Sequence, residues 1–135
     1  MNAPLAGLLA AAPMTAAMVA LHRRLPRAQQ YALPPGRIVS RATGRRHENL
    51  TLAAHLAFAA TAGAAYGLTP KTRRPILDGA AFGAVVWAVS YLGWLPATGL
   101  LPARSEPPRR HALMLAAHLV WGACLGLLAA GSARR

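Results

Sequence analysis

The chain has 135 residues, the length of a single domain, and it combines a formal net charge of +12 with 55% hydrophobic residues. Only 13% of the residues are charged, against roughly 25% in a soluble domain. The apolar content excludes intrinsic disorder, and the single cysteine, Cys124, excludes an internal disulfide framework. Because the charges are segregated from long apolar segments, the composition predicts an integral membrane protein.

Four segments are long and apolar enough to cross a bilayer, which takes about 20 helical residues. They cover residues 4–21, 50–68, 76–95 and 112–130. Backbone polar groups in lipid must bond within their own segment, and none of the four shows the alternation of a barrel strand. The predicted fold is therefore all-α and polytopic: one domain, residues 1–135, with four transmembrane helices in a compact bundle.

The basic residues predict how these helices are oriented. The first segment is followed, not preceded, by arginines, so it is expected to be a retained helix and not a cleaved signal peptide. Loop 22–49 carries seven arginines and loop 96–110 carries three, whereas loop 69–75 carries three basic residues and the C-terminus two. The positive-inside rule then places the two longer loops in the cytoplasm and both termini outside.

A short helix is expected inside loop 22–49, from Pro35 to Thr43, with Gly44 as its stop. Its arginines and its apolar residues lie on different faces, which suits a helix on the membrane surface. Because the arginines of this loop flank spanning helices, we expect them to bind anionic lipid headgroups and not nucleic acid. The expected headgroup-binding residues are Arg23, Arg24, Arg37, Arg41, Arg45 and Arg46.

Part of the sequence is duplicated. The stretch from Arg45 to Leu56 recurs from Arg109 to Leu119 with one residue deleted, and both copies contain Arg-Arg-His and Ala-Ala-His-Leu. The match continues to Gly63 and Gly126. This indicates a two-plus-two helix repeat, in which the halves insert the same way up around an axis along the membrane normal.

The repeat places His55 and His118 at one depth, roughly 10 Å inside their helices at 1.5 Å per residue. Each histidine begins a row of small residues at four-residue spacing, and such rows let helix backbones approach closely in lipid. The two rings are therefore expected to point into the bundle and to reach each other or a shared partner such as Thr15. The expected helix-packing residues are Gly63, Gly67, Gly79, Gly83, Gly122 and Gly126.

Three interpretations of the two histidines remain open. They can hold the bundle together through hydrogen bonds to carbonyls or to hydroxyls, for which Ser90 and Tyr91 are available. They can form a proton-responsive pair, or they can ligate a haem. The spanning segments contain no central acidic or basic residue, and the chain has no zinc spacing, phosphate-binding glycine loop or nucleophile elbow. We therefore expect no catalytic residue, no metal and no cofactor.

Short stretches of the chain resemble a known family. Leu33-Pro34-Pro35, Gly99-Leu100-Leu101-Pro102 and His118-Leu119-Val120-Trp121, with the histidine of the second helix, resemble the YagU-like group of small bacterial inner-membrane proteins. The stretch from Ala88 to Pro96 is similar to shorter, uncharacterised four-helix relatives of that group. The resemblance implies a bacterial inner-membrane location and no assigned reaction; in such a membrane the basic-residue bias given above places the termini in the periplasm.

The expected function is that of a non-enzymatic structural or accessory protein, forming a homo-oligomer or joining a larger membrane complex. One alternative is a small transporter or channel that uses His55 and His118. Another is an electron carrier that binds haem or a quinone.

Overall fold

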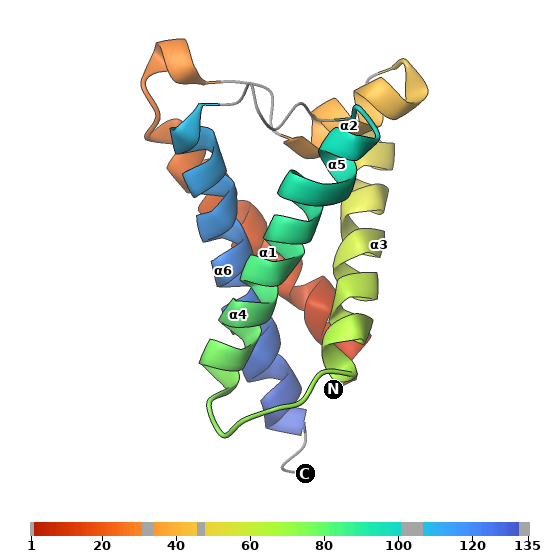
Figure 1. Ribbon diagram of the computed structural model, residues 1–135, viewed down its shortest axis with the longest axis vertical. Coiled ribbons are helices and arrows are strands. Elements are labelled where there is room, and N and C mark those ends of the chain that lie inside the picture. The colour runs from red at the N-terminus through yellow and green to blue at the C-terminus, as the bar shows by residue number, and fades with distance from the viewer. Residues whose placement is uncertain (1, 31–33, 46–47, 101–106, 133–135) are drawn as a thin grey trace.

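The computed structural model describes residues 2–30, 34–45, 48–100 and 107–132. Helices and short connections make up this part of the chain, which contains no strand. Four helical segments are long and apolar enough to span a membrane: α1 (Ala3–Arg23), α3 (Glu48–Gly67), the segment Pro75–Ala97, and α6 (Pro108–Ser132). They alternate in direction, so that the start of α1, the end of α6 and the turn between α3 and α4 share one end of the bundle (Figure 1). The prediction of an all-α, multi-pass bundle is confirmed.

The helix boundaries follow from local chemistry. The Asn2 side chain accepts a hydrogen bond from the backbone N–H of Leu5 at 3.2 Å and so caps α1. Near the start of the third span, Asp78 accepts hydrogen bonds from the backbone N–H and the hydroxyl of Thr72, at 2.7 and 2.8 Å. The fourth helix starts at Pro108, earlier than the predicted residue 112, because proline is well accommodated in a first helical turn.

The third span is not one regular helix, as the sequence had suggested for residues 76–95. It consists of α4 (Pro75–Ala88), a π-helical segment η2 (Val89–Trp94) and the short α5 (Leu95–Ala97). In η2 the N–H of Leu95 bonds to the carbonyl of Ser90, five residues earlier. The wider turn changes the direction in which Ser90 and Tyr91 point, and both side chains are buried.

The predicted surface helix is present as α2 (Pro34–Thr43), after a 3-10 turn η1 (Arg27–Gln29). Gly44 follows it with a positive φ of 72°, a conformation that glycine adopts easily and that ends a helix. The guanidinium of Arg41 donates a hydrogen bond to the carbonyl of Gly99 at 3.0 Å. This bond ties α2 to the turn that follows α5.

The outer surface of the bundle is apolar, as expected for helices surrounded by lipid. Large hydrophobic side chains project outward along all four spans, whereas small residues fill much of the interior of α1 and α3. The exposed large residues include Leu5, Leu9, Leu52, Phe58, Ile76, Leu77, Val85, Val89, Leu92, Leu119 and Leu127. Such a surface in a soluble protein would mark an interaction site, and on helices long and apolar enough to span a membrane it is suited to contact with lipid.

Glycines bring the backbones of α4 and α6 into contact. A Cβ added at Gly79 would lie 2.9 Å from the carbonyl carbon of Gly122, and one added at Gly83 would lie 3.0 Å from that of His118. A Cβ added at Gly126 would overlap the carbonyl oxygen of Pro75. Four of the six predicted packing glycines therefore lie in one helix–helix contact.

A second contact of the same kind joins α1 to α3. A Cβ added at Gly63 would lie 2.9 Å from the Cα of Gly7, and one added at Gly7 would lie 2.8 Å from the Cα of Gly63. A Cβ at Gly67 would meet the Cβ of Ala3 at 3.0 Å, so this residue lies at the edge of the contact. Gly7 was not predicted as a packing residue, because it lies in an alanine-rich stretch without a second glycine.

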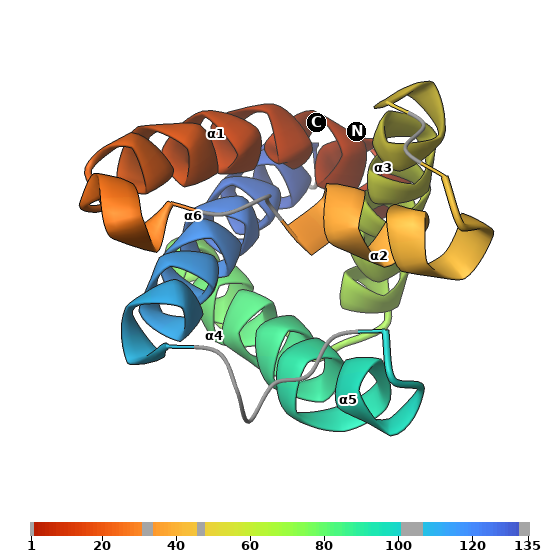
Figure 2. The same cartoon turned by 90° about the horizontal axis from the view of Figure 1, so that it is seen from above.

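The four spans do not pack equally around the bundle. Helix α1 packs against both α3 and α6, and α4 packs against α6, but α3 and α4 barely touch. Figure 2 shows α3 and the α4–α5 segment as separate neighbours of the pair formed by α1 and α6. A pseudo-two-fold axis that relates α1 to α4 and α3 to α6 would give α3 and α4 the same contact as α1 and α6. Because α3 and α4 barely touch, the structure departs from that symmetry at the corner between these two helices.

Candidate functional site

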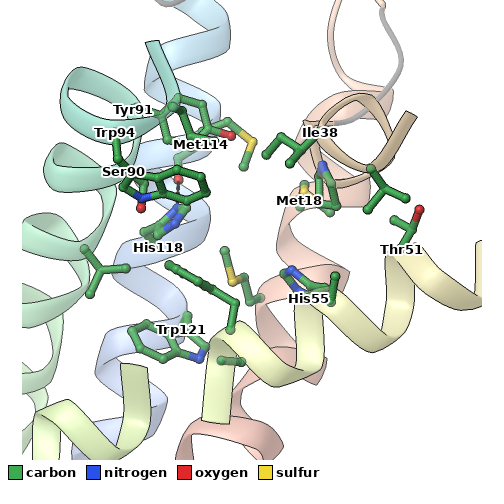
Figure 3. A pocket seen from close by; sticks show the side chains of 18 residues that line it. Met18, Ile38, Thr51, His55, Ser90, Tyr91, Trp94, Met114, His118 and Trp121 are labelled. Carbon is green, nitrogen blue, oxygen red and sulfur yellow. Dashed lines mark hydrogen bonds between the residues drawn. The ribbon is translucent and has the colours of Figure 1, made fainter. Parts of the chain in front are cut away.

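A cavity of about 210 Å³ lies inside the bundle, beside the corner where α3 and α4 separate. Eighteen residues line it, contributed by α1, α2, α3, α4, η2, α5 and α6. Figure 3 shows the side chains of the two histidines pointing into this space from opposite walls, His55 from α3 and His118 from α6. The unequal packing of the helices thus creates an internal space that contains both of the predicted polar residues.

The surface helix α2 covers the cavity. Pro35, Ile38 and Val39 line it, and Val39 is buried. Arg41, on the same helix, is exposed and holds α2 to Gly99 through the hydrogen bond described above. The two faces predicted for this helix therefore have different contacts: apolar residues meet the cavity, and Arg41 fixes the cover in place.

An aromatic cluster closes the bundle on the other side of the cavity. The indole N–H of Trp121 donates a hydrogen bond to the carbonyl of Gly7 at 3.0 Å, which orients this ring at the cavity wall. The ring of Phe82 lies 6.2 Å from that of Trp121 and 5.2 Å from that of Tyr66. These three rings occupy the space between the cavity and the end of the bundle where α1 begins.

The imidazole of His118 has a defined environment. The side chain is 6% exposed, and its Nδ1 lies 2.7 Å from the carbonyl oxygen of Met114, one turn earlier in α6. The ring of Tyr91 packs edge-on against it with centroids 6.0 Å apart. A carbonyl oxygen can only accept, so we assign the proton to Nδ1, which leaves Nε2 as the acceptor nitrogen of the neutral ring.

His55 lies across the cavity and is half-buried. Its Nε2 is buried and makes no hydrogen bond within the part of the chain that the structure describes. The expectation that Thr15 is a shared partner of the two histidines is wrong. Thr15 is exposed, and its hydroxyl bonds to the carbonyl of Ala11 in its own helix at 2.8 Å, as hydroxyls in apolar helices commonly do.

Methionine and aromatic residues supply seven of the other sixteen residues of the wall, and aliphatic residues supply seven more. The methionines are Met14, Met18 and Met114, and the aromatic residues are Phe58, Tyr91, Trp94 and Trp121. The wall also carries three hydroxyl groups in addition to the two imidazoles: those of Thr51, Ser90 and Tyr91. Among the described residues that line the cavity, none is acidic, and none is lysine, arginine or cysteine. The wall can therefore hold an apolar or aromatic group and offer it a few neutral hydrogen-bonding partners.

Other residues singled out in the sequence lie elsewhere. Cys124 is half-buried on α6 and packs against the core without lining the cavity. Among the expected headgroup-binding residues, Arg23, Arg24, Arg37, Arg41 and Arg45 lie toward the α2 end of the bundle, and Arg46 lies outside the described residues. The packing glycines lie in the helix contacts and not in the cavity wall.

Several cavity residues were not identified from the sequence. Met14 and Met18 are four residues apart on α1, and Met114 and His118 have the same spacing on α6, which is a signal that two residues share a face. Trp94, directly before Leu95-Pro96, also lies at the cavity wall.

Comparisons of the chain with protein-family models, with curated proteins and with solved structures each found no match.

Proposed function

We propose that this chain is a non-enzymatic accessory protein of the bacterial inner membrane that holds a small lipid-soluble molecule in the cavity beside α3 and α4. The observation that carries the proposal is the cavity of about 210 Å³ within the spanning helices. An engineered apolar cavity of about 150 Å³ is large enough to bind benzene. Ligand sites are concave, mostly apolar and equipped with a few placed polar groups, and this wall has that composition.

The mouth of the cavity supports entry from the bilayer. Phe58 on α3 and Trp94 in η2 line the cavity, yet 41% and 40% of these side chains are exposed. They therefore mark an opening between α3 and the third span, on a surface that is otherwise apolar. A ligand dissolved in the membrane can reach the histidines through this opening without crossing water.

The alternative functions receive less support from the same geometry. A channel or transporter needs a polar path, and the cluster of Tyr66, Phe82 and Trp121 fills the bundle beyond the cavity with aromatic rings. A haem needs room for four pyrrole rings, which a space of about 210 Å³ does not provide. The size of the cavity favours a ligand with one or two rings.

The arginine-rich end of the bundle is proposed to be cytoplasmic and to contact anionic lipid headgroups. Arg23 ends α1 there and Arg24 follows it; both are exposed, as is Arg45 between α2 and α3. A basic residue near a membrane surface contributes about 1 kcal/mol of attraction to anionic lipids. This orientation places both termini in the periplasm.

We also propose that the two halves of the chain arose by duplication, for which matching contacts provide support. An added Cβ at Gly63 meets the Ala3 carbonyl oxygen and Gly7, whereas one at Gly126 meets the Pro75 carbonyl oxygen and Gly79. In each half the two contacted positions are four residues apart on the preceding spanning segment. Membership of the YagU-like group stays a prediction from the sequence motifs.

Photolabelling tests the proposed cavity. The protein is placed in lipid vesicles that contain a small apolar aryl diazirine, and the labelled residues are identified by mass spectrometry after illumination. We expect labels on cavity residues such as Met114 and Trp121. Ala54→Trp, at a position that lines the cavity, should prevent this labelling, whereas Ala57→Trp, at an exposed position of the same helix outside the cavity wall, should leave it unchanged. Labels confined to the outer surface of the wild-type protein would contradict the proposal.

A further inference from the structure

The tautomer of His118 restricts the chemistry of a ligand. Its Nδ1–H is directed at the Met114 carbonyl, so the ring nitrogen farther from the backbone, Nε2, presents a lone pair. A protonated ring would need a counter-charge, and none of the cavity-lining residues that the structure describes carries a carboxylate. The neutral imidazole of His118 can therefore accept a hydrogen bond from a ligand but cannot donate one from Nε2.

The wall of the cavity offers favourable contacts to an aromatic ring. Thioether sulfurs make favourable contacts with ring edges, and Met14, Met18 and Met114 all line the cavity. Aromatic side chains prefer edge-on or offset contacts with other rings, which Tyr91 and Trp121 can provide. Three sulfurs and four aromatic rings around about 210 Å³ match a flat ring of one or two cycles.

The opposite wall offers a second polar contact. His55 has a buried Nε2 without a partner in the described part of the chain, so neither tautomer of this ring is fixed through that nitrogen. It can accept or donate a hydrogen bond. A ring with oxygens at opposite ends carries one hydrogen-bonding group for each of these walls, since His118 and His55 face the cavity from α6 and α3.

Building on the proposed function, we infer that the cavity binds a lipid-soluble aromatic alcohol, a phenol or quinol head group, whose hydroxyl donates to Nε2 of His118. The ring lies among the methionines, and any tail leaves through the mouth between Phe58 and Trp94. The oxidised quinone fits less well, because its carbonyl oxygens can only accept and would face the lone pair of His118. A buried acceptor left without a donor weakens binding, by roughly 10-fold for one such group.

Competition against the diazirine label provides the test. Three competitors with one decyl tail and one ring are compared in the same vesicles: decylhydroquinone, its dimethyl ether and decylbenzoquinone. We expect the hydroquinone, measured under reducing conditions, to halve the labelling of Met114 at about one tenth of the concentration that the ether requires. The quinone, measured without reductant, should resemble the ether.

A substitution then assigns the preference to one residue. His118→Leu should reduce the difference between hydroquinone and ether to less than about threefold, and the matched control His22→Leu, on α1 away from the cavity, should retain the full difference. The comparison of the three competitors in the wild-type protein needs no variant, so it remains decisive if His118→Leu does not fold.

The outcomes separate the two proposals. If the wild-type cavity is labelled but the alcohol, ether and quinone compete equally, the inference about the hydroxyl group is overturned and the cavity function stands. Stronger competition by the quinone overturns the inference in the same way. If the cavity is not labelled at all, the proposed function itself fails.

Discussion

Gly79 of α4 and Gly122 of α6 touch through their backbones: a Cβ built on either residue would lie 2.9 Å from the carbonyl carbon of the other. Side-chain carbons do not approach backbone atoms so closely, so only glycine fits at both positions. Helices in lipid gain little from the hydrophobic effect, because the surrounding tails are equally apolar. The stability of this pair therefore depends on the close van der Waals contact that the glycines permit.

Replacement of Gly122 by a larger residue tests the contact between α4 and α6. Gly122→Ala should lower the free energy of unfolding in detergent by about 1–3 kcal/mol, because the added methyl group forces α4 and α6 apart. Gly93→Ala is the matched control, since a Cβ at this helical position meets nothing within 4 Å. Thermal unfolding followed by circular dichroism gives both values. Equal midpoints for the two variants would show that the glycine contact is unimportant.

Trp121→Phe removes the indole N–H that bonds to the Gly7 carbonyl while keeping an aromatic ring at the cavity wall. We expect a loss of about 0.5–1.5 kcal/mol, the usual net contribution of one hydrogen bond, with some further loss from the smaller ring. Denaturant titration of the purified protein measures this loss. Trp94→Phe, at the partly exposed mouth, is the control and should cost less. A larger effect at Trp94 would contradict the role assigned to Trp121.

Arg41→Ala should loosen the cover of the cavity without unfolding the bundle. The guanidinium bonds to Gly99 at an exposed position, where such contacts contribute at most about 1 kcal/mol. Faster hydrogen–deuterium exchange is expected in α2, with unchanged exchange in the middle of α6. Arg45→Ala, an exposed position beyond the end of α2, is the control. Unchanged exchange in α2 of the Arg41 variant would show that another contact holds this helix.

His55 and His118 should show energetic coupling, because both side chains face one cavity. The single variants His55→Gln and His118→Gln and the double variant form a thermodynamic cycle, and neighbouring groups couple by about 0.5–3 kcal/mol. His22 paired with His118 is the control and should be additive within about 0.5 kcal/mol. Unfolding free energies in one detergent supply the four corners of each cycle. Additivity of the His55–His118 pair would indicate two separate packing residues.

The orientation of the bundle is tested with reporters fused after Arg135. Loops 22–49 and 96–110 together carry ten basic residues, whereas loop 69–75 and the C-terminus together carry five. This bias predicts that the C-terminus is periplasmic. A reporter active only in the periplasm should therefore give a signal, and a reporter active only in the cytoplasm should not. The reverse pattern would invert the assignment, and the arginine-rich end would then face the periplasm.

Hydropathy and basic clusters were sufficient to predict the four spans and α2, because crossing a bilayer imposes a length and a composition on each helix. The same rule cannot separate the interior from the outer surface, since lipid-facing and core-facing residues are equally apolar. Leu92 is exposed and Leu95 is buried, although both belong to one hydrophobic stretch. Ser90 and Tyr91 were named as possible partners of the histidines, and both line the cavity, but no residue pattern predicted the π-helical segment that carries them.

The separation of α3 from α4 also has a mechanical consequence. Glycine contacts join α1 to α3 and α4 to α6, and an extensive contact between α1 and α6 joins these two pairs. A change in the angle between the pairs would alter the width of the mouth between Phe58 and Trp94 without breaking either glycine contact. Distance measurements between α3 and α4 in bilayers of different composition would show whether the surrounding lipid changes that width.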